Sequence, residues 1–229
     1  MMRNIKKLSL LLVAFLVLSS VFCINAFAEE NEKIIVDTST VYAEIPDGYS
    51  FFPFFDRYYF SNTKGDCIQI LQAGNFNLEN GVKGLTKERA FDIYKYYFNI
   101  DTVFYDYRVA QGKTQKINGI SSYVISGEIL TEYTECDSYE DESGNIVPGE
   151  YCSQYFIAYI FATKENTIIV SYESGGEKTK KHIEDAEKLI KTVLINGTYF
   201  DDEKLSVSHN FTNSPTFEEA MKTATENYN

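Results

Sequence analysis

One segment near the middle of the chain restricts the fold more than any other. It runs from Gln154 to Phe161 and is almost continuously apolar. A strand with one solvated face alternates between apolar and polar residues, whereas a strand that is apolar throughout is covered on both faces. The segment therefore predicts a central strand, and the chain must supply a layer on each side of its sheet.

Two helical patterns can supply those layers. The first spans Thr86–Asn99 with Thr86 as its N-cap, and the second spans Glu177–Ile195. The apolar face of the first comprises Phe91, Tyr94, Tyr97 and Phe98. The apolar stripe of the second comprises Ile183, Ala186, Leu189, Ile190, Val193 and Leu194. His182 stands near the start of the second helix among lysines, and we expect it to be solvated.

The other apolar segments are short and separated by turn residues, which is typical of strands joined by hairpins. The strand candidates are residues 40–45, 57–62, 67–73, 103–110, 114–117, 120–134, 151–162 and 167–172. Asn118 and Gly119 form the strongest turn signal, because both accept the positive φ of a type I′ turn. These elements predict an α+β fold: a three-layer α/β/α sandwich with a mostly antiparallel central sheet and a helix on each face.

The first 28 residues have the pattern of a secretory signal peptide. Basic residues precede an apolar stretch from Leu8 to Ile24, and Ala26-Phe27-Ala28 matches a cleavage site, so we expect cleavage after Ala28. An uncleaved membrane anchor is the alternative, because the stretch is close to the ~18 residues that span a bilayer. Lipid attachment at Cys23 is disfavoured, because Phe22 occupies a position that requires a small residue. The protein is therefore expected to be secreted by a bacterium, with no stable membrane span after cleavage.

The mature chain is expected to form one strongly acidic domain. Cleavage removes three basic and no acidic residues, so the formal net charge changes from −12 to −15. Phosphate contacts need a basic surface, so this charge argues against a nucleic-acid partner. We assign residues 29–200 to a single globular domain, expected to be a monomer. We assign residues 201–229 to a polar C-terminal tail, in which a loose helix over Phe217–Tyr228 is the alternative.

Three cysteines remain after cleavage, in an oxidising compartment that favours one disulfide. Cys136 and Cys152 each end an apolar segment beside a polar loop, so we expect them to pair across a hairpin. Cys67 lies within a strand pattern. We expect it to be a buried, unreactive thiol and not a nucleophile, which would need a basic neighbour.

The acidic loop between those cysteines, residues 137–150, is a candidate metal site. In an alignment with an EF-hand loop, Gly144 takes the sixth position and Glu150 the twelfth. The candidate calcium ligands are Asp141, Ser143, Asn145 and Glu150. However, the first position is Tyr139 instead of Asp, and the flanking patterns are strands instead of helices. A solvated hairpin loop is the alternative interpretation, and the sequence indicates no other cofactor.

Residues 49–60 are rich in aromatic side chains. The five aromatic residues that precede Arg57 follow no clean alternation, so a strand cannot bury all of them. Buried members would belong to the core, whereas exposed members would form a surface for a partner protein, a glycan or a membrane interface. The candidate partner surface comprises Tyr49, Phe51, Phe52, Phe54 and Phe55.

The order of elements resembles the PsbP-like superfamily over residues 38–198. Four pieces carry the resemblance: the strand ending in Glu44-Ile45-Pro46-Asp47-Gly48-Tyr49, the hairpin before the helix at Thr86, Lys116-Ile117-Asn118-Gly119-Ile120, and the last strand leading into Ile183–Ile195. The resemblance implies the α/β/α sandwich and a secreted bacterial member. The superfamily includes an extrinsic subunit of photosystem II and a transport factor that binds the GTPase Ran, so it implies no single activity.

No motif in the sequence points to an enzyme. The chain lacks the nucleophile-elbow, zinc-protease, P-loop and Cys-x-x-Cys patterns. We therefore expect a non-catalytic binding module that engages a protein or cell-envelope component through residues 49–60 and 137–150. Two alternatives are a small hydrolase or transferase with a carboxylate-based site and a calcium-dependent adhesion module. A concave site with converging groups of shifted pKa would favour the enzyme.

Overall fold

The structure is a computed structural model of the whole chain. It describes residues 33–54, 56–74, 76, 78, 80–98, 105–132, 139–140, 146–147, 151–176, 179–200 and 209–228. The chain divides into two units, Met1–Lys33 and Ile34–Asn229. All helices and strands below belong to the second unit. The expected signal peptide, residues 1–28, lies outside the described residues and stays a prediction.

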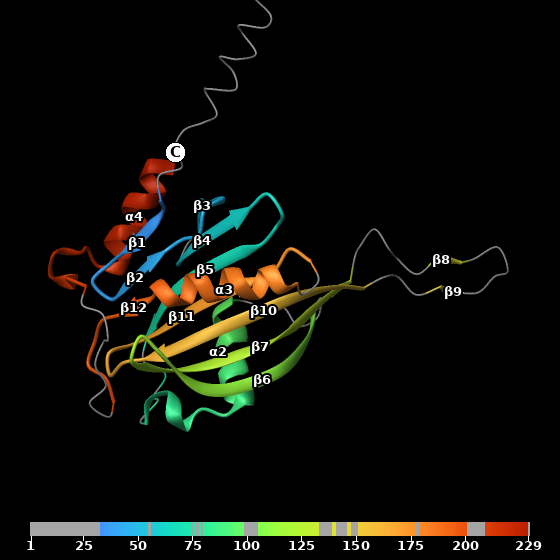
Figure 1. Cartoon of the computed structure of the whole chain (residues 1–229), viewed down its shortest axis with the longest axis horizontal. Coiled ribbons are helices and arrows are strands. Elements are labelled where there is room, and N and C mark those ends of the chain that lie inside the picture. The colour runs from blue at the N-terminus through green and yellow to red at the C-terminus, as the bar shows by residue number, and fades with distance from the viewer. Residues whose placement is uncertain are drawn as a thin grey trace, which may run out of the picture. The chain divides into compact units, whose positions relative to one another are not determined.

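Seven antiparallel strands form the central sheet, in the order β3-β4-β5-β11-β10-β7-β6 (Figure 1). Their bounds are β3 Tyr49–Pro53, β4 Arg57–Asn62, β5 Cys67–Gly74, β6 Tyr105–Ile117, β7 Ile120–Glu132, β10 Tyr151–Ala162 and β11 Asn166–Glu173. β10 pairs with β11 on one side and with β7 on the other. Phe156 and Ile160 face one layer, Tyr159 and Phe161 face the other, and all four are at most 3% exposed. The predicted central strand with cover on both faces is confirmed.

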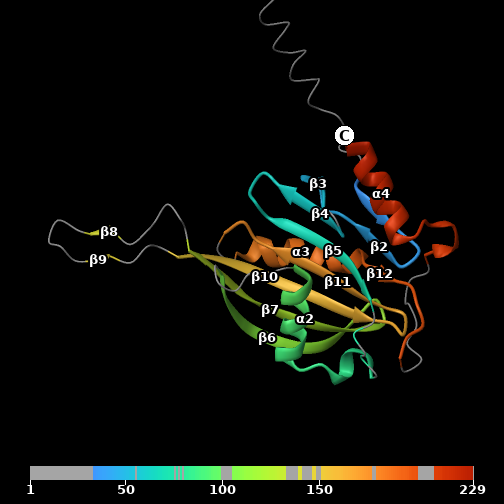
Figure 2. The same cartoon turned by 180° about the vertical axis from the view of Figure 1, so that it is seen from behind.

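One face of the sheet is covered by a helix and a short helical turn (Figure 2). These elements are α2 Lys87–Phe98 and the 3₁₀ turn η1 Gly81–Gly84. Thr86 caps α2 as predicted, because its Oγ1 accepts a hydrogen bond from the N–H of Arg89 at 3.2 Å. Tyr94 is fully buried and stacks on Phe156, with ring centroids 5.4 Å apart. The stack fixes α2 against the centre of the sheet.

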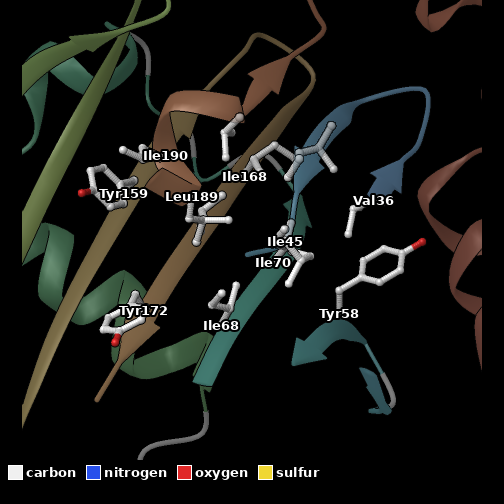
Figure 3. Close-up of a cluster of buried hydrophobic side chains, with 14 of the residues drawn as sticks. Val36, Ile45, Tyr58, Ile68, Ile70, Tyr159, Ile168, Tyr172, Leu189 and Ile190 are labelled. Atoms are coloured by element: carbon white, nitrogen blue, oxygen red, sulfur yellow. The ribbon is translucent and has the colours of Figure 1, made fainter. Parts of the chain in front are cut away.

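The opposite face is covered by a second helix and a small antiparallel sheet. These elements are α3 Lys180–Thr192, β1 Ile35–Asp37, β2 Val41–Glu44 and β12 Leu194–Ile195. Figure 3 shows side chains of α3 and of the central strands meeting in one apolar cluster. The helix ends at Thr192 and not at Ile195 as predicted, because Leu194 and Ile195 pair with β2 instead. The three-layer α/β/α arrangement with a helix on each face is confirmed.

The C-terminal segment adds a third helix to this layer. α4, Phe217–Tyr228, packs on the apolar cluster through Phe217 and Met221, which are 6% and 7% exposed. The two residues are four positions apart, so they lie on the same face of the helix. The N–H of Ser39 donates to the carbonyl of Pro215, which ties the chain before α4 to the turn after β1. The expected polar tail is therefore corrected for residues 209–228, which are part of the fold.

β6 and β7 form one long hairpin. The two strands predicted over 103–110 and 114–117 are a single strand, Tyr105–Ile117, with a bulge between Val109 and Gln111. Asn118 and Gly119 have φ of 49° and 88° at the turn, as predicted for type I′ geometry. A separate short ladder is formed by β8 Tyr139–Glu140 and β9 Ile146–Val147.

Candidate functional site

The aromatic segment forms the edge strand β3, its neighbour β4 and the turn between them. Strand alternation divides its side chains between two faces of the sheet. Tyr49, Tyr58 and Phe60 point into the core and are at most 7% exposed, and Phe51 packs beside them in a half-buried position. Tyr49 was predicted as part of a partner surface. That prediction is wrong, because Tyr49 faces the α3 layer.

Phe52 and Phe54 are the exposed members of the predicted surface, at 40% and 49%. Phe52 points away from the α3 layer because it follows Phe51 in the strand, and Phe54 lies just beyond the strand end. Tyr228, at the end of α4, is 51% exposed, and its ring centroid lies 6.2 Å from that of Phe52. We call Phe52, Phe54 and Tyr228 the aromatic rim. Phe55 lies outside the described residues.

A groove of about 790 Å³ runs between α4 and the turn that joins β3 to β4. Phe54 of the aromatic rim lines it, and Phe217 and Met221 supply its apolar floor. The polar lining residues are Asp56, Gln72, Glu218, Lys222, Thr225 and Glu226. Three carboxylates and one ammonium group line the groove, so its polar wall is acidic.

Arg57 orders the turn at one end of the groove. Its Nε lies 2.8 Å from Oδ1 of Asp56, and its guanidinium carbon lies 5.2 Å from the centroid of the Phe54 ring. The Arg57 side chain is only 4% exposed, so both contacts form at the edge of the interior, where they are stronger than in water. Phe54 is therefore held in position before a partner arrives, which lowers the entropic cost of binding.

The sequence prediction missed the contribution of α4 to this site. Phe217, Met221 and Tyr228 all lie in the segment assigned to a tail. A signal was present, because Phe217, Ala220, Met221 and Ala224 recur at helical spacing. The stripe is short and stands among polar residues, so it predicts a loose helix better than a docked one.

A cluster of polar side chains lies inside the protein, between α2 and the sheet. The carboxylate of Glu173 accepts hydrogen bonds from Tyr94 Oη at 2.6 Å and from Gln69 Nε2 at 3.2 Å, and Cys67 Sγ lies 3.5 Å from it. Burial raises the pKa of Glu173, and these donors together with the charge of Arg57 oppose the increase. Burial also raises the pKa of the Cys67 thiol, so the thiol stays protonated. The expectation that Cys67 is buried is confirmed.

His182 is more enclosed than its lysine-rich surroundings predict. Its side chain is 14% exposed, and Nε2 lies 3.5 Å from Oδ1 of the buried Asp66. Its Nδ1 accepts from the N–H of Thr179, whose Oγ1 accepts from the N–H of His182, which makes a capping box. The prediction of a solvated histidine is wrong, because α3 begins beside the β4–β5 turn that carries Asp66.

Two other predicted sites lie outside the described residues. These are the four candidate calcium ligands in the loop 137–150, and Cys136 of the predicted disulfide with Cys152. Among the residues that the structure describes, no group of three or more His, Cys, Asp and Glu side chains is placed to hold a metal ion.

None of the helices in the described part of the chain combines the length and the apolar character needed to cross a membrane.

Comparisons with known proteins support the fold assignment. No family model and no curated protein matches the sequence. Among solved structures, the solution structure of cyanobacterial PsbP (CyanoP) from Synechocystis sp. PCC 6803 is 7% identical, with a TM-score of 0.51 over 71% of this chain and 92% of that chain. A protein from Bacteroides thetaiotaomicron is 13% identical, with a TM-score of 0.41 over 72% of this chain and 48% of its own. The chain has a PsbP-like fold, which the sequence resemblance predicted.

Proposed function

We propose that the mature chain is a non-catalytic binding module that acts outside the cell and holds an extended segment of a partner protein in the groove beside α4. The observation that carries the proposal is the aromatic rim, which leaves three large rings exposed, one of which, Phe54, lines a groove with an apolar floor. Exposed aromatic side chains around a pocket are typical of the anchors that contribute most of the binding energy at protein interfaces.

The charge of the groove selects among partner segments. Its polar wall holds three carboxylates and one ammonium group, and the mature chain carries −15 overall. Complementary charge accelerates association and discriminates against partners of like charge. The favoured partner segment therefore carries an apolar residue for the floor, flanked by Lys or Arg side chains that pair with Glu218 and lie over the rim.

The position of the carboxyl and thiol groups with the raised pKa values described above supports binding over catalysis in the groove. Glu173 and Cys67 have raised pKa values, and both lie between α2 and the sheet instead of in the groove. A carboxylate-based hydrolase or transferase needs such groups at an accessible concave site. The signal-peptide pattern in residues 1–28 supports the extracellular part of the proposal.

A random-peptide display library, selected on the immobilised protein, tests the proposal. We expect enriched peptides that combine an apolar or aromatic residue with Lys or Arg, and we expect a Phe52→Ser/Phe54→Ser variant to lose their binding. Tyr96→Ser is the matched control, because Tyr96 is 73% exposed and lies on α2, away from the groove.

Two results would contradict the proposal. One is enrichment of peptides that bind the rim variant as well as they bind the wild-type chain. The other is a large loss of thermal stability in the single Phe54→Ser variant, since a buried core residue and not an exposed anchor would behave in that way.

A further inference from the structure

A smaller cavity of about 260 Å³ lies between α3 and the part of the sheet formed by β6, β7 and β10. It shares no lining residue with the groove beside α4. Its apolar lining residues are Val124, Ile157, Ile183, Ala186 and Ile190. Its polar lining residues are Gln111, Lys113, Gln115, Ser126, Tyr155, Tyr159 and Glu187. A cavity on the inner face of a helix is normally lined by apolar residues, so this many polar groups needs an explanation.

Strand register builds the polar wall. Lys113 pairs with Val124 of β7, and Val124 pairs in turn with Tyr159 of β10, so these three side chains form one row on the α3 face. The next row contains Gln111 and Ser126. α3 supplies Ile183, Ala186, Glu187 and Ile190 to the lining of the same cavity.

Three of these polar side chains make no hydrogen bond or ion pair within the described residues. Tyr159 is 3% exposed, and within the described residues its hydroxyl makes no hydrogen bond. Figure 3 shows this hydroxyl pointing away from Leu189 and out of the apolar cluster. Lys113 and Glu187 are exposed residues, and within the described part of the chain their side chains form no ion pair, so both charges are available to a ligand. The Tyr159 hydroxyl lines the cavity and is not fully buried, so a polar atom placed in the cavity can accept a hydrogen bond from it.

The two tyrosine side chains that line the cavity, Tyr155 and Tyr159, both have a raised pKa. Burial raises the pKa of Tyr155 to about 12, with a further contribution from the charge of Glu187. The same two causes, with Tyr155 itself, raise the pKa of Tyr159. Both phenols therefore stay protonated at neutral pH and can donate a hydrogen bond. The cavity thus offers one anionic group, one cationic group and neutral hydroxyl and carboxamide groups above an apolar floor.

We infer that this cavity is a binding site for a small zwitterion, a free α-amino acid. The ligand's ammonium group pairs with Glu187 on α3, and its carboxylate pairs with Lys113 on β6 and accepts a hydrogen bond from Tyr159. Its side chain lies on Ile157 and Ile190. The cavity volume of about 260 Å³ is large enough for one amino acid.

Isothermal titration of the purified protein with individual amino acids tests the inference. We expect binding by a subset of them, and we expect Glu187→Gln and Lys113→Gln each to weaken it by about tenfold or more, because each removes one charge-assisted hydrogen bond. Glu184→Gln is the matched control, because Glu184 lies on the same helix, does not line the cavity and should leave binding unchanged.

Blocked ligands separate the charged contacts. The N-acetyl form of a bound amino acid should lose most of its affinity for the wild-type chain, and the methyl ester should do the same. Absence of binding by every amino acid at about 10 mM would overturn the inference, since even weak small-ligand binding is visible there. Binding of a neutral monosaccharide that is insensitive to Glu187→Gln and Lys113→Gln would also overturn it. Because the cavity and the groove are separate, neither result bears on peptide binding by the aromatic rim.

Discussion

At the scale of single residues, the fold controls the ionisation of Glu173 most directly. The residue as a whole is only partly buried, but its carboxylate is turned inward, where Tyr94, Gln69 and Cys67 surround it. A carboxyl in such a position prefers to keep its proton. Sequence reasoning did not find this cluster, because its members come from β5, β11 and α2 and meet only after the sheet has formed.

Glu173 makes the stability of the protein depend on pH. The folded pKa is raised, whereas the unfolded chain ionises near the usual value of about 4.3. The contribution of the protonated Glu173 to the stability of the fold is therefore complete below the unfolded pKa. This contribution is lost as the pH rises through the folded pKa. Between these two pKa values, the unfolded chain has released the proton and the folded chain has kept it. Across that interval, the free energy of unfolding falls by about 1.4 kcal/mol for each pH unit.

Glu173→Gln removes this dependence, because the neutral carboxamide oxygen still accepts from Tyr94 and Gln69. Urea unfolding at pH 4 and at pH 8 is the measurement. We expect the variant to gain stability relative to the wild-type chain at pH 8 and not at pH 4. Glu184→Gln, on the exposed side of α3, is the control. An equal effect of Glu173→Gln on stability at both pH values would contradict a raised pKa of Glu173 in the folded protein.

At the scale of elements, the local sequence pattern correctly predicted single strands, helix caps and turns. The continuous apolar run of β10, the cap at Thr86 and the turn at Asn118 were all correct. The errors lie where tertiary pairing overrides local preference. Leu194 continues the helical stripe but joins β12, because β2 offers it a strand partner. The docking of α4 depends on an apolar surface assembled from distant segments, and no local pattern shows that surface.

The start of α3 depends on its capping box. Thr179→Ala removes the oxygen that accepts from the N–H of His182, and we expect a loss of about 1 kcal/mol in the free energy of unfolding. Thr179→Ser keeps that oxygen and should restore most of the loss. Chemical denaturation of both variants is the measurement, and equal destabilisation by Ala and Ser would show that the hydroxyl has no capping role.

α4 should stabilise the whole domain through Phe217. This side chain packs edge-on against Tyr58, with ring centroids 5.2 Å apart, so we expect Phe217→Ala to cost about 3 kcal/mol. Lys222→Ala is the control, because the Lys222 side chain is 77% exposed. A thermal scan distinguishes the two cases: a loosely attached tail would give the same midpoint for both variants.

At the scale of the whole molecule, the three layers enclose two apolar clusters, one on each face of a single sheet. The sandwich itself followed from the sequence, because a strand that is apolar on both faces requires two covers. The groove could not be predicted, since its walls come from the turn between β3 and β4, from β5 and from the distant α4. The proposed disulfide and leader peptide concern segments outside the described residues, so they need a direct chemical test.

Intact-mass analysis of the protein collected from culture medium tests both the disulfide and the removal of the leader peptide. We expect a mass that begins at Glu29 and is lower by two hydrogen atoms than the reduced chain, because Cys136 and Cys152 pair. Maleimide should label no thiol in the native protein and one, Cys67, after unfolding without reductant, since Cys67 is 6% exposed. Labelling of two or more thiols in the unfolded, unreduced chain would rule out the disulfide.

The two edges of the central sheet differ in how they resist aggregation. β3 is short, ends at Pro53 and has Tyr228 of α4 beside it. β6 is 13 residues long and forms the other edge of the described sheet. An edge of that length invites edge-to-edge growth with another copy, as in a fibril. The bulge at Val109/Gln111 breaks its hydrogen-bonding repeat, and the like charges of Lys113 and Lys116 repel an identical strand, so both features disfavour such growth.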